Sequence, residues 1–370
     1  MGQQGIDRVV ITGGGTGGHI YPGLAVAKEL KNQIPGVKLL YVGAKDGMEK
    51  EIVPGAGFDF EGITVGGLER RLSIKNIQTF YKLAKGFVEA RSILKNFKPD
   101  VVMGTGGYVS FPVVQAAARR KIPTLIHEQN AFPGLANRML AKRVDRVCIS
   151  YGEAVPYFHK RAKIDVTGLP VRDEILTMGR QEALDFFDLK KDKLTLLVVG
   201  GSRGARSINR AVKRIIQWVA GESSKQLILI TGKLDYQEVI QENREFLNSE
   251  NIRIYSYLDR MEYGLAAADL VVSRAGATFL SELTARGVPG ILIPYPHAAD
   301  NHQEFNARSL EKHGAAKVVL DSQLKDDMLL RDVKELLNPE ILNKMAENSR
   351  MAGKPRALDA IIGIILEMLN

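Results

Sequence analysis

Short runs of valine, isoleucine and leucine recur along the first half of the chain, and segments of helical periodicity lie between them. Continuous apolar runs are typical of parallel strands that are buried on both faces of a sheet. They predict strands at residues 8–12, 37–43, 100–104, 123–127, 145–150 and 163–167. Apolar residues spaced three and four apart predict helices near 19–33, 74–96, 109–120 and 133–142.

The second half of the chain repeats this alternation. Its apolar runs predict strands at 194–200, 226–231, 251–257, 269–273, 290–294 and 316–320. Helices are predicted near 205–220, 235–248, 278–286 and 303–313, and the chain is expected to be helical after Leu320. This order predicts an α/β protein with two Rossmann-like, doubly wound parallel-sheet domains that meet near residues 167–172.

Composition narrows the class of protein. The single cysteine, Cys148, excludes an internal disulfide framework and a multi-cysteine metal site. No secretory signal and no apolar stretch of about 18 residues are found, so we expect neither export nor a membrane span. The net charge of +9 favours an anionic partner, which leaves nucleic acid, anionic lipid and phosphorylated substrates open.

Two predicted strands run directly into glycine-rich turns, at Gly13–Gly18 and Gly200–Gly204. A strand, a glycine turn and a helix together leave backbone N–H groups free to hold a phosphate. Neither turn is a Walker A motif, which argues against a P-loop enzyme. The second strand ends without a carboxylate, which argues against NAD, but Lys45 keeps an NADP-dependent oxidoreductase open.

Polar residues with chemical potential follow the strands of the first half. His19 comes directly after the first glycine turn, where the helix dipole favours a neutral imidazole that can act as a general base. Thr16 offers a hydroxyl in that turn, and Tyr108 follows a third glycine turn. The run His-Glu-Gln-Asn at 127–130 closes another strand, where four polar residues are difficult to explain by packing.

The second half carries a similar set. Ser202 lies in its glycine turn, and Glu282 falls about one turn into the helix after the strand at 269–273. A carboxylate there can bind the hydroxyls of a ribose, although most such glutamates only compensate the helix dipole. Asp300, Gln303 and Asn306 are spaced three apart, which places them on one helix face suited to sugar hydroxyls.

In order, these motifs resemble the MurG family of bacterial peptidoglycan N-acetylglucosaminyltransferases, from about residue 8 to beyond 310. The resemblance implies the GT-B architecture, in which two Rossmann-like domains face a cleft and the C-terminal helix returns to the N-terminal domain. It implies an N-terminal acceptor and membrane-binding domain at 1–168 with the helix 356–370, and a UDP-sugar domain at 169–355. Arg203, Leu169 and Ala275 depart from the usual family pattern.

The implied reaction transfers N-acetylglucosamine from UDP-N-acetylglucosamine to the 4-hydroxyl of the muramyl sugar on undecaprenyl pyrophosphate (lipid I). The configuration at the anomeric carbon is inverted and the product is lipid II, a precursor of peptidoglycan. The resemblance therefore also implies a role in cell shape and cell division. By resemblance, the substrate-binding residues are Thr16, Gly17, Gly18, Tyr108, Asn130, Arg172, Ser202, Leu258, Ala277, Thr278, Glu282 and Gln303. Our first choice for the catalytic base is His19, and Glu128 is the second.

No cofactor is implied, and the sequence contains no Asp-x-Asp motif, so no metal clamp on the diphosphate is indicated. The family works at the cytoplasmic face of the plasma membrane as a peripheral protein, so we expect an anionic inner-membrane surface and other cell-wall synthesis proteins as partners. Residues 69–98 combine a broad apolar arc with basic flanks. This segment predicts either a helix on an anionic membrane or a buried helix with a solvated basic edge.

Other interpretations remain open from sequence. A different nucleotide-sugar glycolipid glycosyltransferase with the same architecture would share most of these motifs. An NADP-dependent oxidoreductase or a non-catalytic membrane scaffold would share the glycine turns or the basic helix. Nucleic-acid binding is not expected, because no motif that reads RNA or DNA occurs.

Overall fold

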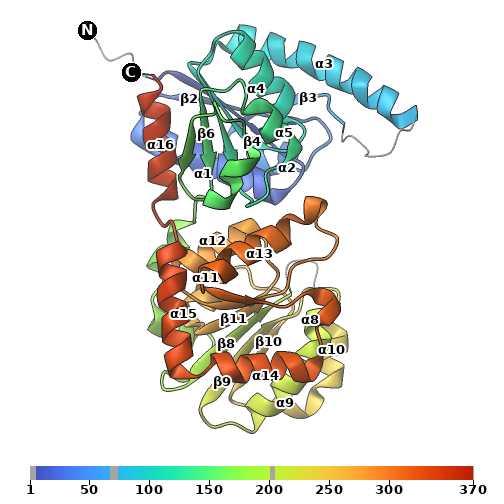
Figure 1. Ribbon diagram of the computed structural model, residues 1–370, viewed down its shortest axis with the longest axis vertical. Coiled ribbons are helices and arrows are strands. Elements are labelled where there is room, and N and C mark those ends of the chain that lie inside the picture. The colour runs from blue at the N-terminus through green and yellow to red at the C-terminus, as the bar shows by residue number, and fades with distance from the viewer. Residues whose placement is uncertain (1–5, 67–73, 201–204, 370) are drawn as a thin grey trace. The chain divides into compact units, whose positions relative to one another are not determined.

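The computed structural model describes residues 6–66, 74–200 and 205–369, and the chain divides into two compact units (Figure 1). Unit 1 takes in the chain up to Pro170 together with the segment from Arg356 onward. Unit 2 runs from Val171 to Pro355. Each unit is built around one parallel sheet, which confirms the predicted fold class.

The sheet of unit 1 has seven strands in the order β3-β2-β1-β4-β5-β6-β7, and all neighbouring strands are parallel. The strands are β1 (Arg8–Gly13), β2 (Lys38–Ala44), β3 (Asp59–Ile63), β4 (Val101–Gly106), β5 (Thr124–Glu128), β6 (Arg146–Ile149) and β7 (Ile164–Val166). The strand order reverses between β1 and β4, and such switch points are where doubly wound sheets bind ligands, at the carboxyl ends of the strands.

Helices cover both faces of this sheet. They are α1 (Gly17–Gln33), α2 (Glu49–Gly55), α3 (Ile74–Phe97), α4 (Ser110–Arg119), α5 (Leu135–Leu140) and α16 (Ala357–Glu367), with a 3₁₀ segment η1 (Gly152–Tyr157). Val10 and Val102 pack in a core with α3 and α4, whereas Val9 and Val101 pack with α1 and α16. Because alternate residues of each central strand are buried on opposite faces, these strands read as unbroken apolar runs.

The last helix, α16, packs against α1 within unit 1. Ile361 and Ile365 of α16 are fully buried in the same core as Ile20 of α1. This confirms the predicted return of the C-terminal helix to the N-terminal domain. Within the described part of the chain, no helix is both long enough and apolar enough to cross a membrane.

The sheet of unit 2 has six parallel strands in the order β10-β9-β8-β11-β12-β13. The strands are β8 (Leu194–Val199), β9 (Lys225–Ile230), β10 (Ile252–Tyr255), β11 (Leu270–Ser273), β12 (Gly290–Leu292) and β13 (Ala316–Val318). Its α-helices are α6 (Asp173–Thr177), α7 (Arg180–Phe186), α8 (Arg206–Ala211), α9 (Lys213–Ala220), α10 (Tyr236–Glu242), α11 (Met261–Ala267), α12 (Ala277–Ala285), α13 (His302–Lys312), α14 (Asp326–Leu336) and α15 (Pro339–Ala352). Short 3₁₀ segments are η2 (Arg244–Phe246), η3 (Ala299–Asn301) and η4 (Asp321–Gln323). The switch point lies between β8 and β11.

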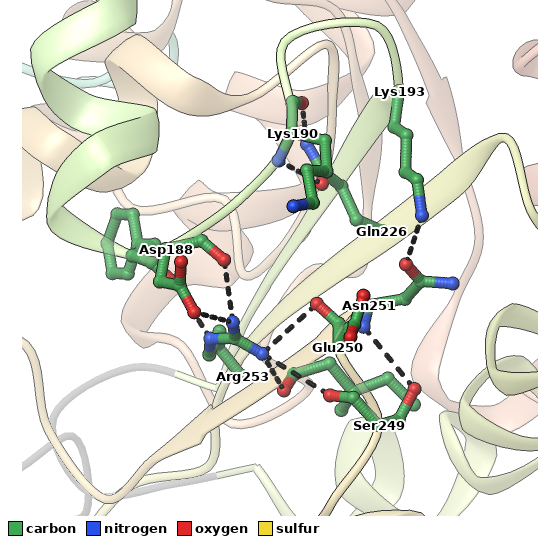
Figure 2. Close-up of polar contacts among 10 residues, drawn as sticks. Asp188, Lys190, Lys193, Gln226, Ser249, Glu250, Asn251 and Arg253 are labelled. Atoms are coloured by element: carbon green, nitrogen blue, oxygen red, sulfur yellow. Dashed lines mark hydrogen bonds and ion pairs between the residues drawn. The ribbon is translucent and has the colours of Figure 1, made fainter.

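An arginine fastens the loops at the amino edge of this second sheet (Figure 2). The Arg253 guanidinium donates to the carbonyl oxygens of Phe187 at 2.7 Å and Asp188 at 2.6 Å, and to the Asp188 carboxylate at 3.0 Å. It also donates to carbonyl oxygens of its own loop, including that of Ser249 at 3.3 Å. The Arg253 guanidinium therefore stabilises the contact between these loops.

Candidate active site

The first glycine turn lies at the switch point of unit 1, between β1 and α1. A Cβ atom added to Gly14 would lie 2.1 Å from Oε1 of Glu49, and one added to Gly107 would lie 2.3 Å from the Gly14 carbonyl oxygen. The Gly14 N–H donates to the Gly106 carbonyl oxygen at 3.3 Å. The first and third glycine turns therefore touch through their backbones, and only glycine allows this approach.

Glu49 at the start of α2 holds the first turn, and the sequence analysis did not identify it. Its buried carboxylate accepts hydrogen bonds from the Ala44 N–H at 2.8 Å and the Gly15 N–H at 3.2 Å. A carboxylate near the end of the second strand is the place where dinucleotide-binding folds hold a ribose. In this chain the Glu49 carboxylate is instead bonded to backbone N–H groups. The only sequence signal was an acidic residue shortly after the Gly43–Gly47 turn.

His19 lies in the first turn of α1 with its ring against the third glycine turn. Its Nδ1 is 3.1 Å from the Gly14 carbonyl oxygen and 3.3 Å from the Thr16 hydroxyl. A carbonyl oxygen only accepts, so Nδ1 carries the proton in the neutral ring and Nε2 carries the basic lone pair. A Cβ atom added to Gly106 would lie 3.2 Å from this Nε2. The geometry suits a general base whose tautomer is fixed by the backbone.

Glu128, at the carboxyl end of β5, is buried and fully engaged. Its Oε1 accepts from the backbone N–H and the side-chain amide of Asn130, at 3.0 and 3.2 Å. Its Oε2 accepts from the Gly134 N–H at 3.0 Å and the Asn137 side-chain amide at 2.9 Å. An ionised carboxylate offers about four lone pairs, so these four donors occupy it. This contact set describes a group that fixes the loop after β5.

His127 and Gln129 connect that strand end to the glycine turns. Nε2 of His127 lies 2.8 Å from the Gly168 carbonyl oxygen, and Nδ1 lies 3.1 Å from the amide nitrogen of Gln129. The Gln129 amide also donates to the Thr105 carbonyl oxygen at 2.8 Å. Burial lowers the pKa of His127, although its bond to Gly168 opposes the shift, so the ring is neutral.

The remaining residues predicted in unit 1 lie around these groups. Thr16 is the N-cap of α1, Gly17 and Gly18 begin that helix, and Asn130 follows β5. Tyr108 follows the third glycine turn and is 56% exposed. Asn137, which binds Glu128, also lies beside Gly106, because its amide nitrogen is 3.7 Å from a Cβ added there. Unit 1 therefore gathers the polar groups of three strand ends around the Gly106 backbone.

In unit 2, the turn between β11 and α12 is clamped by α13. Gly276 is the N-cap of α12, and Ala277 and Thr278 begin the helix. Oε1 of Gln303 accepts from the backbone N–H groups of Ala275 at 3.1 Å and Tyr295 at 3.0 Å. Because two donors fix this oxygen, the amide orientation is set and Gln303 presents its NH₂ group as a donor.

Glu282 lies on the second turn of α12 and is 5% exposed. Its Oε1 accepts from Nε of Arg172, the N-cap of α6, at 2.8 Å. Burial raises the pKa of Glu282, and the hydrogen bond from Arg172 opposes that effect. Arg172 and Glu282, which the family resemblance assigns to the same nucleotide-sugar donor, are therefore in direct contact.

Glu262 of α11 joins this pair and was not anticipated. It is also 5% exposed, its Oε2 lies 3.9 Å from Nη1 of Arg172, and its Oε1 accepts from Nε of Arg260 at 3.0 Å. Leu258, just before α11, is buried, with its side chain beside Gly264. Ser202 lies outside the described residues.

The described part of α3 has one face toward the core and another toward solvent. Ala90 and Leu94 are fully buried, whereas Tyr81 is 71% exposed and Val88 is 69% exposed. Positions 81 and 88 are two turns apart on the same side of a helix. Exposed basic residues flank them at Lys82, Lys85 and Arg91.

Two parallel sheets, each with a reversal of strand order, and glycine turns at the switch point of unit 1 define the class of nucleotide-binding α/β enzymes. Of the second glycine turn, residues 201–204 lie outside the described part of the chain. The model of the glycosyltransferase family 28 N-terminal domain matches residues 9–149, and that of the family 28 C-terminal domain matches residues 195–361. The chain belongs to glycosyltransferase family 28.

Relatives extend the match over the full length. The UDP-N-acetylglucosamine–N-acetylmuramyl-(pentapeptide) pyrophosphoryl-undecaprenol N-acetylglucosamine transferase of Desulforamulus reducens is 50% identical over 367 residues, covering 98% of this chain and 99% of the relative. The enzyme of the same description from Halothermothrix orenii is 50% identical over 97% of this chain and 98% of the relative.

Solved structures agree. The crystal structure of Acinetobacter baumannii MurG matches with a TM-score of 0.79 and 28% identity, covering 98% of this chain and 99% of that one. A UDP-GlcNAc 2-epimerase from Neisseria meningitidis matches with a TM-score of 0.67 and 16% identity, covering 97% of this chain and all of that one, which shows the fold alone.

Proposed function

We propose that the chain transfers N-acetylglucosamine from UDP-N-acetylglucosamine to the 4-hydroxyl of the muramyl sugar of lipid I, with inversion, and forms lipid II. The observation that carries this proposal is 50% identity across 98% of the chain to an enzyme described by that reaction. The glycine turn at the switch point of unit 1 supports it, because such a turn can hold a diphosphate at a helix N-terminus, and the sequence after β8 carries a second glycine-rich run.

The proposed donor site is centred on unit 2. The Glu282 carboxylate accepts from the ribose hydroxyls, and the Gln303 amide donates to a hydroxyl of the transferred sugar. Ser202 and the backbone of its turn bind the diphosphate, and the backbone of Leu258 meets the uracil. The resemblance to the family assigns further donor contacts to Arg172, Ala277 and Thr278 of unit 2 and, separately, to Thr16, Gly17, Gly18 and Asn130 of unit 1. His19 and Tyr108 face the acceptor diphosphate.

The proposed chemistry is a single displacement. Nε2 of His19 takes the proton of the acceptor 4-hydroxyl while that oxygen bonds to the anomeric carbon. The bond from that carbon to the diphosphate breaks, and UDP leaves with the electron pair. Backbone N–H groups and Arg172 stabilise the charge that develops on the leaving group. The four donors on Glu128 support His19 over Glu128 as the base.

We also propose that unit 1 rests on the anionic cytoplasmic face of the plasma membrane through α3, near other cell-wall synthesis proteins. Exposed Tyr81 and Val88 would enter the interface, and the flanking lysines would meet lipid phosphates. Reversing Lys82, Lys85 and Arg91 to Glu should weaken binding to anionic vesicles roughly 100-fold, at about 1 kcal/mol per basic residue. The same reversal at exposed Lys28, Lys38 and Lys50 is the control, and equal partitioning of both variants would exclude α3.

The deciding experiment incubates the purified chain with radiolabelled UDP-N-acetylglucosamine and a short-chain lipid I analogue. We expect label to enter the lipid product only when both substrates are present. UDP-glucose and UDP-galactose, each tested against the same acceptor, identify the alternative glycolipid glycosyltransferase. Transfer from one of these but not from UDP-N-acetylglucosamine would replace the proposed reaction. Transfer from none of the three would reject it.

A further inference from the structure

A pocket of about 600 Å³ opens on unit 1, away from the proposed catalytic groups. Its walls come from the segments that lead into β5, β6 and β7 and from the end of α16. The polar residues of the candidate active site follow the carboxyl ends of the strands, so this pocket lies at the opposite, amino edge of the same sheet. Part of its lining is apolar, formed by Ile122, Pro123 and Met368.

The lining carries four basic and two acidic side chains, and both acids have partners within unit 1. The Asp145 carboxylate accepts from the Thr124 N–H at 2.8 Å and from the Thr124 hydroxyl at 3.1 Å. The Glu367 carboxylate pairs with Arg146 at 2.8 Å, and Arg146 also holds Asp165 at 3.2 Å. These contacts leave the other three basic side chains of the pocket without an acidic partner.

Those three side chains are Lys121, Arg143 and Lys163. None forms an ion pair with a carboxylate among the residues that the structure describes. Arg143 meets only a neutral group, because the amide oxygen of Gln115, once turned toward it, accepts from its Nη1 at 2.8 Å. Lys121 has a left-handed backbone with φ of 58°, which is uncommon for lysine. Three cations thus share a concave, partly apolar site.

The same edge of unit 2 is built differently. There, the Arg253 guanidinium is filled by carbonyl oxygens and by the Asp188 carboxylate, and Lys193 contacts the side-chain oxygen of Asn251 (Figure 2). In unit 1, by contrast, Arg143 has no carboxylate partner within the described part of the chain, and its guanidinium shares one pocket with the exposed ammonium groups of Lys121 and Lys163. Three cations around one concavity favour an anionic ligand.

We propose that this pocket binds a phosphate group borne by a small organic molecule or by a lipid headgroup. A guanidinium and two ammonium groups suit the three charged oxygens of a phosphate. The apolar wall suits the carbon skeleton next to it. The site is separate from the transfer reaction, and its occupation requires neither the nucleotide sugar nor the acceptor.

The test compares two double variants of the full chain. Lys121→Gln with Lys163→Gln removes two charges from the pocket, whereas Lys38→Gln with Lys50→Gln removes two exposed charges elsewhere on unit 1. Thermal unfolding first verifies that both variants fold. Glycerol 3-phosphate binding by calorimetry and partitioning into phosphatidylglycerol or phosphatidylcholine vesicles are then measured for each.

We expect the pocket variant to lose at least 10-fold in affinity for glycerol 3-phosphate or for phosphatidylglycerol vesicles, while the control keeps the affinity of the unmodified chain. Loss for glycerol 3-phosphate identifies a soluble phosphate ester as a ligand. Loss for the vesicles alone identifies a lipid headgroup. If neither probe binds saturably, or if both variants respond alike, the pocket is not a phosphate site.

Discussion

Both units place a buried glutamate at the carboxyl edge of their sheet, but the partners of the two carboxylates differ. Glu128 of unit 1 accepts from four uncharged donors, whereas Glu282 of unit 2 pairs with the guanidinium of Arg172. A carboxylate filled by neutral donors shapes a loop and has no lone pair left for a substrate. A carboxylate held by one cation keeps acceptor capacity for another donor.

The same difference extends to the neighbouring groups. In unit 1, backbone and amide groups orient His19, Glu49 and Glu128, so the site is formed before any ligand arrives. In unit 2, the charges of Arg172, Glu262 and Glu282 set the geometry near the proposed ribose site. We therefore expect changes in unit 1 to affect the chemical step or stability, and changes in unit 2 to affect donor affinity.

Replacing His19 gives the largest expected effect. His19→Ala removes the proposed base, and general-base catalysis contributes roughly 10²- to 10⁴-fold in rate. We expect kcat to fall by that factor while the KM for UDP-N-acetylglucosamine changes less than about threefold. Steady-state kinetics with a lipid I analogue measure both. The basic group should also disappear from the pH–rate profile, and a profile unchanged in shape would exclude His19 as the base.

Glu128→Ala tests whether this carboxylate shapes the loop. The change removes the acceptor of the buried Asn137 amide and of three partly buried donors, and an unsatisfied buried donor costs about 1 to 3 kcal/mol, so we expect a loss of about 3 to 5 kcal/mol in the free energy of unfolding. Urea unfolding of the full chain measures it. The matched control is Glu61→Ala at an exposed position of β3, which should stay within about 0.5 kcal/mol of the unmodified chain. Equal stability of the two variants would contradict the structural role.

Gln303→Glu tests the proposed sugar contact in unit 2. The new carboxylate can still accept from Ala275 and Tyr295, but it loses the NH₂ donor and adds a negative charge near the proposed diphosphate site. We expect the KM for the donor to rise about 10-fold, which corresponds to about 1.4 kcal/mol, with a smaller change in kcat. Gln241→Glu on α10 makes the same charge change at an exposed position. If both variants show the same KM, Gln303 does not contact the sugar.

His127 makes the stability of unit 1 sensitive to acid. Burial lowers its pKa, so the unfolded chain takes up a proton below about pH 6.5 while the folded chain does not. The free energy of unfolding should therefore fall with pH from there down to the lowered pKa, by at most about 1.4 kcal/mol per pH unit for one proton. His127→Gln should reduce this slope and exposed His159→Gln should not. Urea unfolding between pH 7.5 and 5.5 measures it, and equal slopes in both variants would rule out His127.

The central strands of both sheets could be predicted because burial on two faces leaves few polar positions in them, such as Thr12 and Thr195. The edge strand β3 (Asp59–Ile63) was missed for the converse reason. Its burial alternates, and its sequence Asp-Phe-Glu-Gly-Ile reads as a polar turn. The predicted helix at 205–220 is divided into α8 and α9 at Val212. Such breaks depend on packing that a single sequence does not show.

The residues of the candidate site likewise fall into those that the sequence predicted and those that it did not. Residues next to glycine turns and strand ends were identified because turn chemistry is local. The contact between Arg172 and Glu282 joins positions 110 residues apart and follows only from the tertiary structure. Glu49 and Glu262 lie in helices that carry no motif, and their inward orientation is set by the backbone and by arginines that the fold brings to them.

A change at Glu262 gives the smallest expected effect, and it tests the charged group formed by Arg172, Glu262 and Glu282. Its carboxylate is 3.9 Å from Arg172, a distance at which a partly exposed pair contributes about 0.2 to 1 kcal/mol. Glu262→Gln should loosen Arg172 and raise the donor KM about two- to fivefold, with kcat unchanged, because we expect Glu262 to act on the donor through Arg172. Exposed Glu238→Gln on α10 should leave KM unchanged. In an Arg172→Lys background the effect of Glu262→Gln should shrink, since the planar guanidinium that it orients is gone. An undiminished effect there would show that Glu262 reaches the donor by another route.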